Sequence, residues 1–274
     1  MNGRAICAVV RKDLKVASQN KGVTLPIVIS IVVLFGVLPW LVTLLPAVMN
    51  GAGVSAGDLD KVQGLIGGLA PGLQQQLAKY EDNQVFTVFF LVYMLAPLFL
   101  IIPLMVSSVI AADSFAGEKE RKTMEALLYT PTTDRELFAA KLLSGWLAAF
   151  AVALAGFVLY TIMANAAGWP QMQRIFFPNA MWLVLFFWVV PALPGLGVGV
   201  MVLVSARAQG FQDAYQTGGA VVLPVVLLLV GQVTGMMYLS VPLVALLGAV
   251  IWLLDGLLIW LGSRSFRRGR LMGA

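Results

Sequence analysis

Histidine is absent from this sequence of 274 residues, and cysteine occurs only once, as Cys7. Without histidine, the His-containing zinc sites of metalloenzymes, histidine ligation of haem and Ser-His-Asp catalysis are all excluded. A single thiol can form neither a disulfide within the chain nor a thiolate cluster. We therefore predict no catalytic residue, no metal site and no cofactor in this chain.

Charged residues are also scarce. They make up 11% of the chain and hydrophobic residues 60%, whereas an average soluble domain is about a quarter charged. Six apolar stretches are long enough to cross the bilayer as helices, which takes about 20 residues each. They cover residues 23–48, 85–112, 142–166, 179–204, 217–237 and 241–262. The sequence therefore predicts an all-α integral membrane protein with six transmembrane helices.

The net charge of +5 has a topological explanation. Such an excess of cations, taken alone, would also fit a nucleic-acid-binding protein. Six spans, however, place fifteen of the 18 cations on one side of the membrane, and only Lys61, Lys79 and Arg174 on the other. Because Lys and Arg mark the cytoplasmic side, we predict cytoplasmic N- and C-termini, a multi-pass location in the inner (cytoplasmic) membrane, and no nucleic-acid partner.

The first 22 residues are predicted to form a cytoplasmic unit that precedes a six-helix domain at 23–274. Between residues 2 and 20, apolar side chains such as Ile6, Val10 and Leu14 recur at spacings of three and four, with cations between them. This pattern is typical of an amphipathic helix that lies in the membrane interface. A basic arm in solution is the alternative interpretation.

The one charged block in the chain is segment 113–141, between the second and third apolar stretches. Residues 118–129 fit a short helix, which Pro131 ends because proline disfavours helical geometry in the residue before it. Thr133 and Glu136 form a capping-box pattern at the start of a second helix that runs through Lys141. A short charged helix on a turn suits docking into a groove of a soluble partner. Alternatively, the segment only caps the inner ends of two spans.

This block resembles a known signature. The stretch from Ser114 to Pro131, followed ten residues later by Lys141, is similar to the pattern Glu-x-Glu-x-x-Thr-x-Glu-x-Leu-Leu-x-x-Pro of ABC-2 type transporter permeases. The matching residues are Glu118, Glu120, Thr123, Glu125, Leu127, Leu128 and Pro131. A second stretch, residues 205–216 with Pro224, resembles the inner loop before the fifth span of the same family.

The resemblance implies an ABC-2 (type V exporter-like) permease fold, with an N-terminal interfacial helix and a cytoplasmic coupling helix. It implies a permease subunit that exports substrate, pairs with a second permease (the same or a related chain), contacts membrane lipid and rests on a cytoplasmic ABC ATPase subunit. Arg121 joins the seven matching residues as a candidate for coupling to the ATPase. The chain has no Gly-x-x-x-x-Gly-Lys-Ser/Thr loop, so ATP and Mg are expected in the partner.

Two other functions remain open from the residues alone. A passive channel or membrane scaffold would leave the 118–131 motif without a purpose. An intramembrane enzyme would need a site such as paired carboxylates, and Asp255 has no acidic partner within the spans. Co-purification of a stoichiometric ATPase would favour the transporter over both.

Asp255 is the only acid deep inside an apolar stretch, where an Asp costs about 3 kcal/mol near the bilayer centre. It is a possible intramembrane polar site for a cation or substrate. Structural interpretations are a polar partner such as Gln232 or Thr234, or a position near the inner surface.

Small and cyclic residues interrupt the apolar stretches. The pairs Gly195–Gly199 and Gly231–Gly235 permit close helix contact. Pro97 and Pro103 in the second stretch, and Pro191 and Pro194 in the fourth, are expected to kink or unwind these helices.

Overall fold

The computed structural model describes residues 3–51, 68–122 and 133–265 of the chain. These residues are almost entirely helical and include no strand, which confirms the expected all-α fold. Six helices are long and apolar enough to cross a membrane, and each corresponds to one predicted span. They cover Lys21–Leu45, Gln84–Glu120, Arg135–Met172, Ala180–Ser205, Phe211–Val233 and Val241–Gly262.

The spans are numbered 1 to 6 in chain order, and most contain several helical elements. Helix α1 (Gly3–Gln19) precedes span 1, which contains α2 (Lys21–Ile31), the π-helical η1 (Val32–Val37) and α3 (Leu38–Gly51); α5 (Pro71–Leu77) follows. Span 2 combines α6 (Asp82–Val88), η2 (Phe89–Met94), α7 (Leu95–Ala112), η3 (Asp113–Gly117) and α8 (Glu118–Glu120). Span 3 is α10 (Asp134–Met172). Span 4 comprises α11 (Ala180–Val184), η4 (Leu185–Val189) and α12 (Leu193–Ser205). Span 5 comprises α13 (Phe211–Gly218), the 3₁₀ turn η5 (Gly219–Val222) and α14 (Leu223–Val233), and span 6 is α15 (Val241–Ser265).

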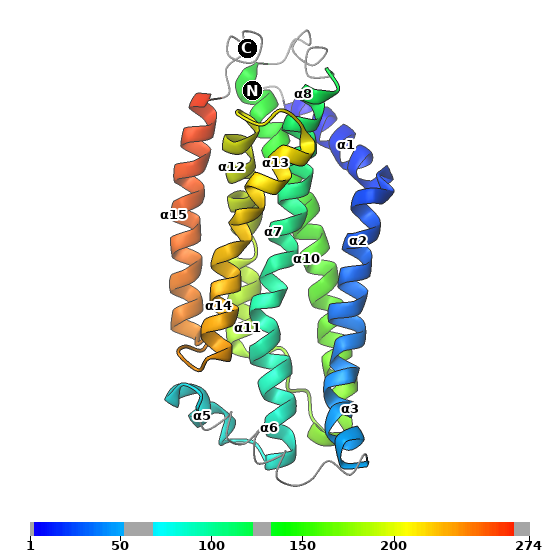
Figure 1. Ribbon diagram of the computed structural model, residues 1–274, viewed down its shortest axis with the longest axis vertical. Helices are drawn as coiled ribbons and strands as arrows, with labels where there is room; N and C mark the ends of the chain where they lie inside the picture. Colours follow the sequence, from blue (N-terminus) through cyan, green and yellow to red (C-terminus); the bar gives the residue numbers. More distant parts are fainter. Residues whose placement is uncertain (1–2, 52–67, 123–132, 266–274) are drawn as a thin grey trace.

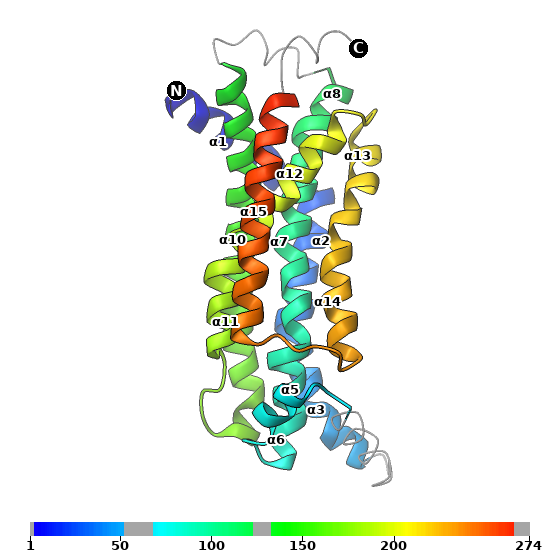
Figure 2. The ribbon, with the colours of Figure 1, turned by 90° about the vertical axis from the view of Figure 1, so that its left-hand side faces the viewer.

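Spans 2 and 4 form the centre of the bundle, and α7 runs through its middle (Figures 1 and 2). In the apolar part of span 2, 61% of the residues are buried, and in span 4, 56%, against at most 28% in the other four spans. Large apolar side chains such as Leu227 and Leu253 are exposed on the outer helices. An outer surface of this kind suits contact with lipid rather than water.

The two ends of the bundle differ. Helix α1 lies obliquely across one end of the bundle, which also carries α8 and the last turns of α15, and we call it the α1 end (Figures 1 and 2). The opposite end carries α5 and the start of α6, and we call it the α5 end. Helix α1 matches the helix expected over residues 2–20 and packs against α10.

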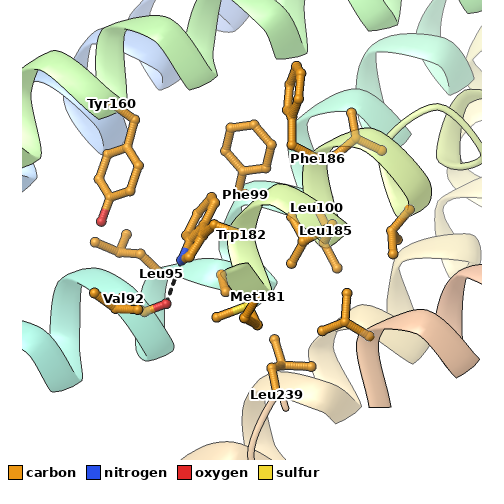
Figure 3. Packing of buried hydrophobic residues seen from close by; sticks show 14 of the residues in the cluster. Val92, Leu95, Phe99, Leu100, Tyr160, Met181, Trp182, Leu185, Phe186 and Leu239 are labelled. Carbon is orange, nitrogen blue, oxygen red and sulfur yellow. Dashed lines mark hydrogen bonds between the residues drawn. The ribbon is translucent and has the colours of Figure 1, made fainter. Parts of the chain in front are cut away.

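Aromatic side chains fill the core between spans 2, 3 and 4 (Figure 3). Trp182 and Tyr160 are fully buried there. The Trp182 indole N–H donates to the Val92 carbonyl at 2.7 Å, and the Tyr160 hydroxyl donates to the Leu91 carbonyl. Both carbonyls belong to the π-helical η2. Donors from spans 3 and 4 thus satisfy backbone groups of this irregular stretch, which hydrocarbon could not do.

The prolines act differently in the two central spans. Span 4 is interrupted by a turn at residues 190–192, as expected from Pro191 and Pro194. The Trp146 indole N–H donates to the Pro191 carbonyl at 2.7 Å, which satisfies one carbonyl at this break. In span 2 the helix α7 continues through Pro97 and Pro103.

Gly195 and Gly199 both face α15, as the close-contact prediction requires. A Cβ atom at Gly195 would lie 2.5 Å from the Asp255 carboxylate, and one at Gly199 would lie 2.8 Å from Leu258. The prediction is wrong for the other pair: Gly231 faces Met237 just beyond its own helix. Gly235 adopts a left-handed φ of +72° in the turn after α14.

Candidate functional site

The charged residues 113–122 lie at the α1 end, at the tip of span 2. The apolar pattern predicts that this span ends at residue 112 and that a separate helix begins at residue 118. The span instead continues without a break through η3 into α8, which begins at Glu118 and ends at Glu120. Lys122, with a left-handed φ of +57°, follows this end. Two buried polar residues beyond 112, Ser114 and Glu118, stay in the helix because side chains of α1 and α10 satisfy them.

Five of the coupling candidates lie outside the described residues: Thr123, Glu125, Leu127, Leu128 and Pro131. The rest of the helix expected over 118–129 also lies outside them. The second expected helix is confirmed: Thr133 is the N-cap of α10, and its side chain and that of Glu136 form a complete capping box.

Glu118 is buried, and its carboxylate joins three elements. One oxygen accepts from the Lys141 ammonium of α10 at 2.6 Å, and the other accepts from Lys12 of α1 at 2.5 Å. Lys141 is fully buried and also donates to the Ser114 carbonyl at 2.5 Å. A buried carboxylate held by two ammonium groups is a charge-compensated arrangement. Glu118 therefore holds α1, span 2 and span 3 together.

Asp13 of α1 completes this arrangement. It is 5% exposed, and its carboxylate accepts from the Ser114 hydroxyl at 3.2 Å and the Ser144 hydroxyl at 3.3 Å. Lys12 lies 3.4 Å from it. We call this arrangement the Glu118 cluster; it consists of Lys12, Asp13, Ser114, Glu118, Lys141 and Ser144.

The charges of the cluster reinforce one another. Burial lowers the pKa of Lys12, but its hydrogen bond to Glu118 and the charges of Glu118 and Asp13 outweigh this effect and raise the pKa above its ordinary value. The ammonium form is therefore favoured at neutral pH, and it supports the ion pair with Glu118.

The other two coupling candidates described by the structure lie at the surface. Glu120 is exposed, and its carboxylate accepts from the Phe211 backbone N–H, at the start of α13, at 2.9 Å. A negative charge is favourable at a helix N-terminus. The Arg121 guanidinium donates to Asp113 at 2.9 Å. Glu118 and Glu120 thus contact different spans.

A groove of about 700 Å³ lies between α2, α7 and α13, on the side of span 2 that Glu120 faces. Its volume lies within the range of small-molecule pockets. Most of its polar side chains lie toward the α1 end, whereas its lining along α7 is mainly apolar. The polar set includes Asn20, Asp113, Glu120 and Arg121, and the apolar set includes Ile27, Met105, Val106 and Phe211.

Asp255 lies in span 6 and is only 3% exposed. Its Oδ1 has no hydrogen-bond partner within the part of the chain that the structure describes. The expected partners are wrong: the Gln232 amide donates to the Tyr93 carbonyl, and the Thr234 hydroxyl donates to the Val230 carbonyl. The carboxylate packs against Gly195 of span 4.

Sequence reasoning missed Lys12, Asp13 and Lys141 as site residues. A signal existed for Asp13, which is the only acid in the basic N-terminal arm and shares a helical face with apolar residues. Across residues 3–51, 68–122 and 133–265, no group of three or more His, Cys, Asp or Glu side chains could hold a metal ion.

Comparison with known proteins gives one match. A family model described as "ABC-2 family transporter protein" matches residues 7–251. The match begins within α1, ends within α15, and includes the whole charged segment 113–141. No curated protein and no solved structure matches the chain.

Proposed function

Because this chain belongs to the ABC-2 transporter family and is a permease component of an ABC transporter, we propose that it exports substrate from the cytoplasm. ATP and Mg are bound by a separate cytoplasmic ATPase subunit, since the chain lacks a phosphate-binding loop. Two permease chains, identical or related, form the transmembrane pathway in the inner membrane. The α1 end faces the cytoplasm.

The observation that carries this proposal is the uninterrupted span 2. From Asp82 to Glu120, one continuous succession of helical elements passes through the centre of the bundle and ends in exposed charges. The tip residues Lys119, Glu120, Arg121 and Lys122 are accessible to a docked subunit. A displacement of the tip residues 118–122 is therefore transmitted to the bundle core through a single run of helix.

The groove supports a role in substrate uptake. It combines a polar part near the cytoplasmic surface with an apolar part beside α7. This arrangement suits an amphiphilic molecule that enters from the inner leaflet. Nucleotide-driven closure of the ATPase pair would favour one state of the permease only if the contacts differ between states.

The first experiment tests the ATPase partner. We expect the affinity-tagged permease, expressed in its own organism, to retain an ATPase subunit in stoichiometric amount and to show vanadate-sensitive ATP hydrolysis. The charge is reversed at Glu125 and not at Glu118, because Glu118 is bound within the permease. The Glu125 reversal should reduce this hydrolysis. A permease that purifies alone from such cells would favour a channel or scaffold.

The second experiment tests orientation. Cys7 is exposed in α1 and is the only thiol in the chain. A membrane-impermeant maleimide should label it in inside-out vesicles and leave it unlabelled in intact cells. Labelling in intact cells would place the α1 end outside and contradict both the topology and the function.

A further inference from the structure

Glu118 and Glu120 lie two residues apart in α8, and their side chains bond to elements on opposite sides of this helix. A step of two residues turns a helix by about 200°, so one carboxylate reaches Lys12 and Lys141 and the other reaches Phe211. We propose that Glu120 is a positioning residue that latches α13 over the groove, and that this latch opens during each transport cycle while the Glu118 cluster stays closed. The inference rests on the proposed function.

The two attachments differ in what their opening requires. Opening the Glu118 cluster would leave charges uncompensated at buried positions, because Lys141 is 0% exposed and Glu118 is 6% exposed. The Glu120 carboxylate is exposed and receives one backbone N–H bond, which water can replace. The Lys119 ammonium adds a long bond of 3.4 Å to the Ala208 carbonyl. The attachment to α13 is therefore the one that opens more easily.

The packing beneath α13 also permits movement. Ala214 of α13, and Ala208 just before this helix, belong to the same buried cluster as Ala111, Ala112 and Ala116 of span 2. Small side chains give a smooth surface along which one helix can slide over another. No ion pair joins α13 to α7 or η3 within the described residues.

A hinge lies at the far end of α13. The helical hydrogen bonding changes to the 3₁₀ type over Gly219–Val222, and Pro224 follows at the start of α14. A 3₁₀ stretch inside a longer helix often marks a functional hinge. A Cβ atom at Gly219 would meet nothing within 4 Å, so the chain has room to bend there. Helix α13 can thus rotate about η5 when the Glu120 latch opens.

Such a rotation changes the groove directly. Phe211 and Tyr215 of α13 form part of its wall, and their rings stack with centroids 6.0 Å apart. The facing wall is made by α2 and α7. Movement of α13 away from Glu120 widens the groove next to its polar part, whereas α1 and span 3 keep their positions on span 2.

A disulfide between α8 and the α13 start tests the latch. In a Cys7→Ser background, the pair Glu120→Cys and Gly210→Cys is suitable, because a Cβ at Gly210 would lie 3.5 Å from the Glu120 Cγ position. The complex with its ATPase is oxidised without nucleotide and after trapping with Mg-ATP and vanadate. We expect cross-linking to differ by at least about fivefold between the two states. Equal cross-linking in both states would overturn the latch.

The matched control joins α1 to its partners in the Glu118 cluster. Asp13→Cys is combined with Ser144→Cys or with Ser114→Cys, whose hydroxyls lie 3.3 and 3.2 Å from the Asp13 carboxylate. These pairs should cross-link equally with and without trapping. A closed latch disulfide should lower vanadate-sensitive ATP hydrolysis until dithiothreitol reduces it. If trapping changed the cross-linking of the control pairs as much as that of the latch pair, the proposal that the latch opens while the Glu118 cluster stays closed would be wrong.

A second measurement uses the permease without its ATPase. In the same Cys7→Ser background, Met105→Cys places a thiol on the groove wall, and its reaction with N-ethylmaleimide reports groove opening. Glu120→Ala should accelerate labelling several-fold, and Glu120→Gln, which keeps an acceptor for the Phe211 N–H, should accelerate it less. Labelling of Leu143→Cys on α10 should not change. The inference would be overturned if the Glu120→Gln and Glu120→Ala variants were labelled at equal rates, or if Glu120→Ala did not change the labelling rate.

The two tests separate failure of this inference from failure of the proposed function. If no vanadate-sensitive ATPase associates with the wild-type permease, the proposed function fails, and the labelling result still decides whether Glu120 holds α13. If the ATPase associates and hydrolyses ATP but the latch pair does not respond to trapping, only the inference is wrong.

Discussion

The ammonium group of Lys141 lies 2.6 Å from the carboxylate of Glu118, in a site that excludes solvent from the lysine completely. The two residues belong to different spans, so the bond fixes the relative position of spans 2 and 3 at the α1 end. Because Lys12 bonds the same carboxylate, helix α1 is fixed with them.

Replacement of Lys141 should therefore be costly. Lys141→Ala removes one partner of a buried ion pair, and we expect the free energy of unfolding to fall by about 3–5 kcal/mol. The matched control is Lys119→Ala, because Lys119 is exposed and makes one long bond, and its effect should stay within about 0.5 kcal/mol. Unfolding of the purified protein in mixed detergent micelles measures both. Equal effects would contradict a structural role of the cluster.

The capping box at the start of α10 gives a smaller and more local prediction. Thr133→Ala removes the acceptor for the Glu136 N–H, and we expect a loss of about 1 kcal/mol. Amide hydrogen exchange should accelerate in the first turn of α10. Thr217→Ala, at an exposed position inside α13, should leave both quantities unchanged. Unchanged exchange in the Thr133 variant would show that the cap contributes nothing.

Features that depend on neighbouring residues were predictable from the sequence. The six spans follow from apolar length, and the capping box of Thr133 and Glu136 follows from a spacing of three residues. Such patterns are local, because each element needs only its own residues to reveal it.

Features that depend on distant partners were not predictable. Asp113, Ser114 and Glu118 look like the end of an apolar span, yet the helix continues through them to Glu120. The polar groups of Ser114 and Glu118 are satisfied by Lys12 and Asp13, about 100 residues away, and by Lys141 in the next span. Asp113 instead has a local partner, Arg121. Asp255 shows the same limit, since nothing in its local sequence identifies Gly195 as its neighbour.

Asp255 is buried, and among the residues that the structure describes none bonds its Oδ1, so we infer a structural role that does not need the charge. A neutral amide is less costly in hydrocarbon than a carboxylate. We therefore expect Asp255→Asn to unfold at the same temperature as the wild type or higher. Vanadate-sensitive ATP hydrolysis by the complex should be measured on the same preparation. Loss of hydrolysis in an equally stable protein would instead assign an essential role to the charge.

The contact between α7 and α12 gives the sharpest packing prediction. Gly197 of α12 faces α7 so closely that a Cβ atom would meet the Ser107 hydroxyl and would lie 3.0 Å from the Leu104 carbonyl. The hydroxyl can rotate away, but the carbonyl belongs to the helix backbone and cannot. Gly197→Ala must therefore push spans 2 and 4 apart, and we expect a loss of about 1–3 kcal/mol in the free energy of unfolding.

Gly256→Ala is the matched control for Gly197→Ala, because Gly256 also lies inside a span and a Cβ there would meet nothing within 4 Å. Alanine favours a helix over glycine, so this variant should be as stable as the wild type or slightly more stable. The expected changes in the free energy of unfolding have opposite signs in the two variants, although both add the same methyl group to a helix. This difference separates the effect of close packing from that of helix propensity. If Gly197→Ala were as stable as Gly256→Ala, spans 2 and 4 would not be in the close contact that places α7 at the centre of the bundle.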